Sequence, residues 1–576
     1  MLTSTQQQGS AAARTPTAAT TTTTTATTAA AAAKVPPAST TAQIAKPRRS
    51  VLGRLARGLA VLGVAGGVGL AVQAKRDEGT ARSLEFWRIV MPIYAHYRYV
   101  QWKVSGMSDE EQDRAFNELH DRYAPVVRDA VLQLRGFYLK ACQVVSTVDY
   151  FCPPQYLKWA KEMQDQAPTT LQPGEAERIV AESLGKPLDE VFSSFETTPC
   201  GCASIGQVHR ARLRSNGEEV AVKVQAPGIE HKFRADIGTV KAFCQFALPH
   251  MAPPMEEIER QFETEFDYLG EASNLTEVHD KIMPVFGSRV AIPKPYPEYS
   301  TSRVLVMEFL DGQPLIDGIR ESMKIVAEHQ GRSYEDLERE HWELIRLGKF
   351  EDIDKEEKKF RHYQRLLDAQ RTVHNGVRAV YNGTLGMVFG RVEYEPRIHL
   401  LNLAHIIRLM AKVHGHEILI DGVFNCDPHP GNILLLKDGR LGLIDLGQCK
   451  RLPKDFQRTY AQLIIALDNG EKEKVVSLMQ QMGNTSKYGN VDVQYRLAQF
   501  WHDRSDKEVF QGKNLQEFLE FCESEDPVVG MGDHLVMPSR VSVLLRGISN
   551  AFGIDLSIAR LWRPIAEEAL SSSAQA

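Results

Sequence analysis

Four short stretches of this chain carry lysine, glutamate, aspartate and asparagine side chains in an order that suits phosphoryl transfer. They are Val220 to Lys223, an acidic segment that reaches Glu271, Asp427 to Asn432, and Asp445 to Gly447. Phosphoryl transfer mainly requires positioning and charge: a lysine for the α/β-phosphates of a nucleotide, a glutamate that holds this lysine, and an Asp and an Asn that carry Mg²⁺. The sequence therefore predicts a site for ATP and Mg²⁺, in which the catalytic and metal-binding residues are Lys223, Glu271, Asp427, Asn432 and Asp445.

The spacing of the last two stretches supports such a site. Asp427 precedes Asn432 by the interval that separates the catalytic Asp from the metal-binding Asn in protein kinases. Between Asn432 and Asp445, two apolar runs flank the turn 437–439, which predicts a β-hairpin that places Asn432 beside Asp445. Each short motif is weak alone, because buried strands with one lysine and chance Asp-x-x-x-x-Asn runs are both common. Their occurrence together and in order favours a kinase-like site.

Length and composition indicate a globular protein of two or three domains. The chain has 576 residues, of which 43% are hydrophobic and 24% charged, so it can bury a large core. Residues 1–76 hold nine Lys or Arg and no acidic residue, which leaves 59 basic against 73 acidic residues, a net charge of −14, in the remainder. An acidic body without a basic stripe argues against nucleic acid as a partner. Eight mostly isolated cysteines indicate a reducing compartment rather than a disulfide framework.

The N-terminal residues predict targeting and membrane attachment. Residues 1–50 are rich in Thr, Ala, Ser and Gln with scattered Lys and Arg, which predicts a disordered transit peptide, the alternative being a low-complexity tail. The uncharged run 58–74 predicts a transmembrane helix, the alternative being a buried soluble helix weakened by five glycines. Gly63 and Gly67 form a small-residue face through which two such helices could pair as a homodimer.

Helical patterns follow in two regions. Residues 83–192 show helical periodicity and no strand pattern, and an apolar stripe recurs at helical spacing along Met255 to Asn274. Glu265 falls within that stripe, whereas Glu271 lies roughly 120° away around the expected helix. The two glutamates therefore point in different directions, and one cannot easily replace the other.

These motifs together resemble the UbiB family of atypical kinases, the aarF-domain-containing proteins of bacteria, mitochondria and plastids. The resemblance covers about Phe86 to Leu467. The motif Gly447-Gln448 is similar to that of plant and algal members. The other segments that carry the resemblance are Lys140 to Gln143, Ala203 to His209, Val220 to Gly228, Glu265 with Asp267, and Asp427 to Asn432.

The resemblance implies an α+β, two-lobed protein-kinase-like fold with an N-terminal helical extension packed over the nucleotide site. The extension would be residues 83–192, the N-lobe 193–310, and the C-lobe 311–576 with a charged helical insertion at about 320–399. The lid of the site would comprise Lys140, Gln143, Glu265 and Asp267, with Glu265 assigned to Lys140 and Glu271 to Lys223.

The resemblance also implies a nucleotide-binding surface. Its phosphate loop and neighbouring strand would supply Ala203, Ser204, Gly206, Gln207, Val208 and Lys223. The run Val304 to Gly312 reads as a buried strand entering a turn, which suits the hinge between lobes. Backbone groups of Glu308, Phe309 and Leu310 would face adenine there.

The chain also departs from related patterns. Gly201 and Cys202 replace alanines in the phosphate loop, and Cys142 replaces the glycine of the lid motif. Only five residues separate Gly447 from Pro453, which leaves no room for the activation segment on which protein kinases bind peptides. We therefore expect no phosphorylation of proteins in trans.

The sequence thus predicts an atypical kinase or ATPase, and the resemblance implies a role in isoprenoid-quinone (ubiquinone-like) or other lipid metabolism at an organelle membrane. The expected partners are membrane lipids and proteins of isoprenoid-lipid biosynthesis. The mitochondrial inner membrane is favoured as the location, with a plastid membrane as the alternative. A non-catalytic scaffold that binds nucleotide or lipid is the alternative function, because the substitutions in the phosphate loop and lid leave turnover open.

Overall fold

The computed structural model describes residues 73, 76–146, 153, 155–156, 159–160, 171–203, 205–247, 259, 264–346, 349–398, 400–513 and 515–573. The predicted transit peptide, the Gly63/Gly67 face and nearly all of the predicted transmembrane helix lie outside these residues. Within them, no helix is both long enough and apolar enough to cross a bilayer.

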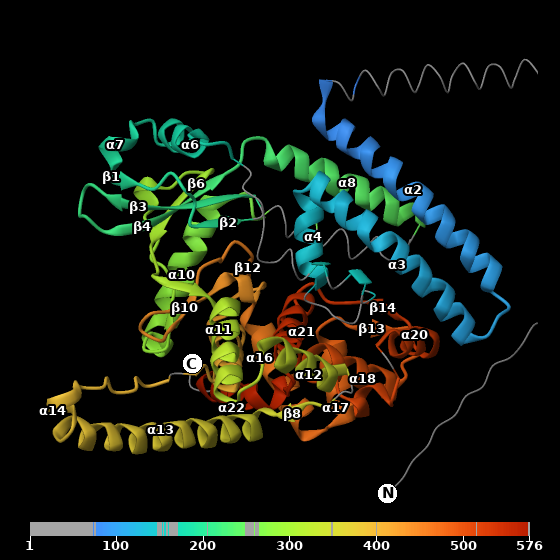
Figure 1. Cartoon of the computed structure of the whole chain (residues 1–576). Coiled ribbons are helices and arrows are strands. Elements are labelled where there is room, and N and C mark those ends of the chain that lie inside the picture. Colours follow the sequence, from blue (N-terminus) through green and yellow to red (C-terminus); the bar gives the residue numbers. More distant parts are fainter. Residues whose placement is uncertain are drawn as a thin grey trace, which may run out of the picture. The chain divides into compact units, whose positions relative to one another are not determined.

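Before the first strand, the described part of the predicted extension is helical, and its first three helices pack near α8. They are α2 (Glu78–Val104), α3 (Asp109–Leu134) and α4 (Phe137–Ser146). Figure 1 shows α2 lying along α3 and along α8 (Ile229–Ala247). The Arg82 guanidinium donates to both carboxylate oxygens of Asp236 on α8, at 2.9 and 2.5 Å. The extension is therefore fixed to α8 by a largely buried ion pair.

The N-lobe is built on an antiparallel sheet in the order β1-β3-β4-β6, with β2 paired to β3. Apolar residues alternate inward along β4, where Val220, Val222 and Val224 are fully buried. Figure 1 shows the sheet with its flanking helices. The elements are α6 (Glu175–Leu184), α7 (Leu188–Val191), β1 (Phe192–Phe195), β2 (Gly201–Ala203), β3 (Gly206–Leu213), β4 (Glu219–Gln225), α10 (Tyr268–Phe286), β5 (Val290–Ala291), η2 (Pro297–Tyr299) and β6 (Val304–Glu308).

A second sheet begins the C-lobe and contains the predicted hairpin. Its order is β5-β11-β10-β7. Ile433 on β10 lies opposite Leu443 on β11, so the hairpin prediction is confirmed. The elements up to the end of this region are β7 (Gly312–Pro314), α15 (Leu403–His416), the π-helix η3 (Glu417–Asp421), β9 (Val423–Asn425), η4 (Pro430–Asn432), β10 (Ile433–Leu436), β11 (Leu441–Leu443) and β12 (Cys449–Arg451).

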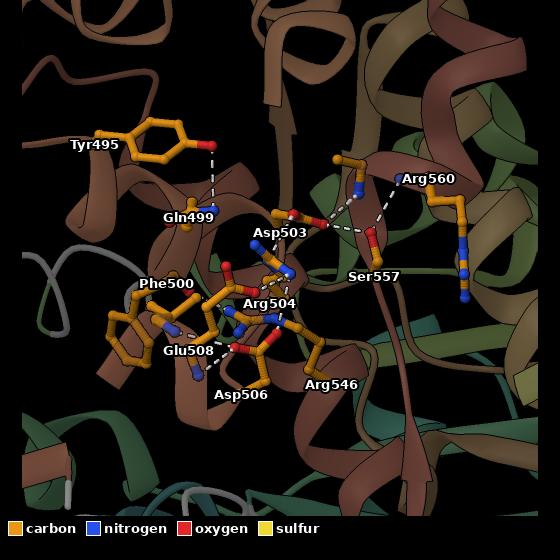
Figure 2. Close-up of polar contacts among 12 residues, drawn as sticks. Tyr495, Gln499, Phe500, Asp503, Arg504, Asp506, Glu508, Arg546, Ser557 and Arg560 are labelled. Atoms are coloured by element: carbon orange, nitrogen blue, oxygen red, sulfur yellow. Dashed lines mark hydrogen bonds and ion pairs between the residues drawn. The ribbon is translucent and has the colours of Figure 1, made fainter. Parts of the chain in front are cut away.

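Helices dominate the rest of the C-lobe, and a polar cluster around the buried Asp503 joins several of them. Figure 2 shows Asp503 beside Ser557, and Arg504 between Asp506 and Glu508. Asp503 accepts hydrogen bonds from Ser557 Oγ at 2.6 Å and from the Ala559 backbone N at 3.0 Å. The elements are α16 (Lys454–Asn469), α17 (Lys472–Gln481), β13 (Thr485–Ser486), α18 (Val491–His502), α19 (Lys507–Phe510), α20 (Leu515–Glu525), β14 (Val528–Gly530), α21 (Val536–Ala551), β15 (Ile554–Asp555) and α22 (Ile558–Ser573).

The region of the predicted charged insertion is mostly helical up to residue 389. From residue 390 to 402 the described chain is not helical. The elements are α11 (Leu315–His329), α12 (Tyr334–Arg346), β8 (Glu351–Asp352), α13 (Ile353–Gly383) and α14 (Gly386–Phe389).

Candidate functional site

The ammonium group of Lys223 lies between two carboxylates. Its Nζ is 2.8 and 2.9 Å from the two oxygens of Glu271 and 3.5 Å from Asp445 Oδ2. Lys223 comes from β4 and Glu271 from the first turn of α10. Burial by itself lowers the pKa of Lys223, but Asp445 and Glu271 together raise that pKa well above its ordinary value. The lysine is therefore a fixed positive charge at neutral pH, as a phosphate-binding group requires.

The hairpin brings the predicted metal ligands to one end of its two strands. The Ile444 backbone N donates to the Asn432 backbone O at 3.2 Å, directly before Asp445. Asp445 Oδ1 accepts from the Gly447 backbone N at 3.0 Å, which fixes the carboxylate at the start of its turn. A carboxylate and an amide oxygen, both partly exposed, are ligands that suit Mg²⁺.

Asn425 connects the predicted catalytic loop to the predicted metal motif. Its side chain accepts from the Asp427 backbone N at 2.9 Å and donates to the Asp445 backbone O at 3.1 Å. One buried amide therefore sets the relative position of Asp427 and Asp445. The sequence analysis did not assign Asn425 a role; a polar residue at the end of an apolar strand, two positions before the catalytic Asp, was the available signal.

Arg540 is a second residue that the sequence analysis missed. It lies on α21, and its guanidinium is 3.6 Å from Asp427 Oδ1 and donates to Gln448 Oε1 at 3.1 Å. Gln448 Nε2 in turn donates to Glu265 Oε1 at 2.6 Å. A continuous polar network thus joins Asp427, Gln448 of the predicted metal motif, and the turn before α10. No local pattern around residue 540 indicates this contact.

The expected continuous helix from Met255 to Asn274 is wrong at its centre. Residues 265 and 266 form a turn, and α10 begins only at Tyr268, with Asp267 as its N-cap accepting from the Gly270 backbone N at 3.0 Å. At the start of a helix the first backbone N–H groups have no carbonyl partner within the helix, and the Asp267 side chain accepts a hydrogen bond from one of them. This cap stabilises a helix start at Tyr268 and explains the break. Glu265 and Glu271 still point to different partners, Gln448 and Lys223 respectively.

Two of the four predicted lid residues, Lys140 and Gln143, lie on α4, whose packing connects it to the turn that holds Glu265. The Phe137 ring contacts Phe233 on α8, and Phe233 contacts Phe266, each with 5.3 Å between ring centroids. Phe266 follows Glu265 directly. The side chains of Lys140 and Gln143 lie outside the described residues, so the assignment of Glu265 to Lys140 stays a prediction.

The phosphate loop is a tight hairpin between β2 and β3. Ala203 lies opposite Gly206, and Val208 lies opposite Lys223 on β4. A Cβ atom on Gly206 would lie 2.1 Å from the Val224 backbone O, so this close approach of β3 to β4 requires glycine.

Two further details define what this hairpin can offer a nucleotide. The Gln207 side chain is buried and lies 3.3 Å from His209 Nε2, so only its backbone can serve a nucleotide. Ser204 and the side chains of Cys202 and Ala203 lie outside the described residues.

The predicted buried strand is present as β6, and the hinge role of the residues that follow it stays a prediction. Glu308, the last residue of β6, lies opposite Val220, and the Phe309 backbone N donates to the Glu219 backbone O at 3.2 Å. The Arg210 guanidinium lies 4.5 Å from the centre of the Phe309 ring. Glu308 ends β6, and Phe309 and Leu310 lie in the link from β6 to β7.

Comparison with known proteins finds similarity to one family of atypical kinases over part of the chain. A family profile described as "ABC1 atypical kinase-like domain" matches residues 162–335 and 394–479. The AarF domain-containing protein kinase 1 of Gallus gallus is 26% identical over 390 residues, covering 66% of this chain and 60% of the relative. ACTIVITY OF BC1 COMPLEX KINASE 7, a chloroplastic protein of Arabidopsis thaliana, is 23% identical over 505 residues, covering 85% and 60% respectively.

The chain thus spans about 60% of the length of the curated relatives it matches. A solved chain from Mycobacterium tuberculosis, described as the complex structure of Rv3197 with erythromycin, is 22% identical with a TM-score of 0.42, covering 78% of this chain and 97% of its own. The profile leaves 336–393 unmatched, which falls inside the predicted insertion.

Proposed function

The chain carries an ABC1 atypical kinase-like domain of the UbiB family, and from this premise we propose that it binds Mg²⁺ and ATP for hydrolysis or for phosphoryl transfer to a small molecule. The observation that carries the proposal is the position of Lys223 between Glu271 and Asp445. A buried lysine held by one glutamate beside a metal-binding Asp is the arrangement that kinases use to hold the nucleotide phosphates.

The residues of the site would divide the work as follows. Lys223 would bind the α/β-phosphates, and Glu271 would keep it in place. Asn432 and Asp445 would hold Mg²⁺, which supplies charge neutralisation at the phosphates. Asp427 would orient the acceptor hydroxyl or water and accept its proton. Arg540 contacts the Asp427 carboxylate, and Asn425 bonds the backbone of Asp427 and of Asp445, so both would be positioning residues.

The substrate is proposed to be a small molecule rather than a protein. After Gly447 the chain enters β12 at Cys449 and begins α16 at Lys454. Protein kinases use the corresponding place for the long segment that binds peptides. The short connection therefore supports the expectation that proteins are not phosphorylated in trans.

The pathway and location are proposed from the resemblance and the relatives. Isoprenoid-quinone or other lipid metabolism at an organelle membrane is the proposed context, with membrane lipids and isoprenoid-lipid biosynthesis proteins as partners. Three Arabidopsis relatives are described as chloroplastic, which supports an organelle. The mitochondrial inner membrane and a plastid membrane are both compatible with that support.

The experiment compares Asp445→Asn with Asp438→Asn in the purified full chain. Asp438 lies in the exposed turn of the same hairpin and pairs with Arg440, so it is a matched control. We expect Asp445→Asn to abolish Mg²⁺-dependent nucleotide binding and turnover measured with membranes present, and Asp438→Asn to leave both unchanged. Unchanged binding and turnover in Asp445→Asn would refute the assignment. Lipid analysis of a null strain carrying each variant tests the pathway.

A non-catalytic scaffold is the second candidate, and the phosphate loop favours it. A Cβ atom placed on Gly201 would have the Val208 Cβ, at 3.9 Å, as its nearest neighbour, so alanine would fit at this position. The glycine found there therefore leaves the backbone of the loop less constrained than alanine would. If the protein is a scaffold, the Asp445→Asn variant should still complement the null strain. If it is an enzyme, this variant should fail to complement.

A further inference from the structure

A buried pair, His414 and Glu417, lies where α15 ends and the π-helix η3 begins. His414 is 1% exposed and Glu417 is fully buried. His414 Nδ1 lies 2.9 Å from Glu417 Oε2, and because an ionised carboxylate only accepts, the imidazole is the donor. The second oxygen, Oε1, is buried without a hydrogen-bond partner among the described residues. An unpaired buried carboxylate oxygen is costly, so stability alone does not explain this pair.

The Glu417 carboxylate also holds the backbone of β9. Its Oε2 accepts from the Asn425 backbone N at 3.3 Å. The next residue faces β12, because the Cys426 backbone N donates to the Gln448 backbone O at 2.8 Å. The Asn425 backbone N therefore points to the opposite edge of β9, where the described sheet has no further strand. Glu417 takes the place of that strand and satisfies a buried backbone donor.

The residue held in this way is the one that connects the two aspartates of the site. The Asn425 side chain accepts from the Asp427 backbone N at 2.9 Å and donates to the Asp445 backbone O at 3.1 Å. Three consecutive hydrogen bonds thus lead from His414 through Glu417 and Asn425 to the predicted catalytic loop. A displacement of about 1 Å in such a supporting contact can cost about a hundredfold in rate.

The turn that carries Glu417 is itself packed from two sides. The Gly422 backbone N donates to the Glu417 backbone O at 2.8 Å, which closes the π-turn. A Cβ atom on Gly422 would lie 2.7 Å from Gln457 Nε2 of α16, and one on Gly415 would lie 2.6 Å from Trp562 Cδ1 of α22. The carboxylate therefore projects from a fixed turn towards the loop. Single π-turns of this kind occur frequently at functional sites.

We propose that Glu417, oriented by His414, is a positioning residue that fixes the backbone of Asn425. Through the Asn425 amide it aligns Asp427 with Asp445. The inference rests on the proposed function for the roles of these two aspartates, whereas the hydrogen bonds that carry it are independent of turnover. Removing the Glu417 carboxylate should therefore loosen the loop and impair turnover and Mg²⁺ binding, while nucleotide binding without metal stays intact.

The first experiment observes the loop directly and needs no turnover. Hydrogen exchange of backbone amides in 423–432 is measured by mass spectrometry in the unmodified full chain, in Glu417→Met and in Asp503→Ala. Asp503 is the matched control, because it is a buried carboxylate that accepts from the Ala559 backbone N at 3.0 Å. We expect exchange at Asn425 and Asp427 to rise about tenfold in Glu417→Met only, the factor that one net hydrogen bond provides. Unchanged exchange in Glu417→Met, or an equal rise in Asp503→Ala, would overturn the proposal.

The second experiment compares turnover, Mg²⁺ affinity and metal-free nucleotide affinity in the same proteins and in Glu417→Gln. The glutamine Oε1 can still accept from the Asn425 backbone N, so this variant tests rescue. We expect Glu417→Met to lower turnover about tenfold to a hundredfold with metal-free nucleotide affinity changed less than about twofold, and Glu417→Gln to recover most of the turnover. A parallel fall of turnover, nucleotide affinity and melting temperature would show a merely structural role and contradict the proposal.

A second variant covers the case in which Glu417→Met does not fold. His414→Leu combined with Glu417→Met removes both polar partners at similar volume, an exchange that is often neutral for stability. The same results are expected of it, and unchanged exchange would again overturn the proposal. If the unmodified chain shows no Mg²⁺-dependent turnover, the proposed function fails and the exchange result alone decides the inference. If it turns over as fast as the Glu417→Met variant, the proposed function stands and the inference fails.

Discussion

Replacing Glu271 with glutamine should be less destructive to stability than the loss of a buried ion pair usually is. With an effective dielectric constant of about 20, the Lys223–Glu271 contact of 2.8 Å corresponds to about 6 kcal/mol of attraction and the Lys223–Asp445 contact of 3.5 Å to about 5 kcal/mol. The Asp445 side chain is 35% exposed against 1% for Glu271, so solvent weakens its share. Asp445 can therefore replace Glu271 as the partner of Lys223 only in part.

This reasoning predicts strong coupling between the two carboxylates. We expect Glu271→Gln to lower the free energy of unfolding by about 2 kcal/mol and Asp445→Asn to lower it by less than about 1 kcal/mol, because in each case one carboxylate still faces Lys223. The double variant leaves Lys223 buried without either carboxylate. Its free energy of unfolding should fall by about 3–5 kcal/mol, the usual cost of breaking a buried ion pair. The coupling energy should exceed about 1 kcal/mol.

Urea unfolding of the four proteins measures this coupling, and binding of a fluorescent ATP analogue with Mg²⁺ provides the second readout. In Glu271→Gln, Lys223 should move towards Asp445, so nucleotide affinity should fall more than stability does. Additive losses in the two single variants would refute the idea that Asp445 substitutes for Glu271. Full nucleotide affinity in Glu271→Gln would refute the role of Glu271 in placing Lys223.

Three further predictions concern other parts of the molecule. Gly206→Ala should lower the free energy of unfolding by about 3 kcal/mol, because the new Cβ would lie 2.1 Å from a backbone oxygen. Gly201→Ala should instead raise the free energy of unfolding by about 0.4–1 kcal/mol. Thermal denaturation of the two variants measures both changes, and equal effects would contradict the geometry. Burial lowers the pKa of His502 from 6.5 to about 3, so the stability that depends on neutral His502 is complete above pH 6.5 and is lost as pH falls towards 3. In urea unfolding at a series of pH values, His502→Gln should lose less stability over this range than the unmodified protein. If the free energy of unfolding falls equally with pH in both proteins, this prediction is wrong. Arg540→Gln should lower the turnover number by about tenfold and leave nucleotide affinity unchanged, because Arg540 contacts Asp427 and not Lys223. Arg540→Lys should recover part of the lost turnover. Weakened nucleotide binding in Arg540→Gln would show that Arg540 does not act through Asp427.

The parts of the site that the sequence could predict are those set by neighbouring residues. Asp427, Asn432 and Asp445 are brought together by one loop and one hairpin, so their spacing along the chain carries their geometry. Asp267 also had a local signal, an N-cap residue with Glu271 in the following turn, and that signal contradicted the continuous helix inferred from apolar periodicity. A prediction from periodicity alone extends the helix through Asp267, although an Asp side chain at this position favours the start of a new helix.

The contacts that the sequence could not predict depend on distant segments. Arg540 reaches Asp427 because α21 packs against α15 and α18, and nothing near residue 540 indicates that packing. Helix α13 presents the opposite case. Its apolar residues Leu366, Val373, Val377 and Val380 recur at helical spacing, which predicts a helix whether that face is buried or exposed, and only the structure shows that the described chain leaves them exposed.

The charges of the site explain why a divalent cation should be part of it. Among the described side chains, the polar network and the Lys223 pocket contain two cations, Lys223 and Arg540, and four carboxylates, Glu265, Glu271, Asp427 and Asp445. Each cation is already engaged by a carboxylate, so the group as a whole retains two negative charges. Such an excess repels the phosphates of a nucleotide unless a divalent cation enters with them. The same accounting explains why Asp445, the more exposed carboxylate beside Lys223, is the one suited to meet that cation, while Glu271 stays with the lysine.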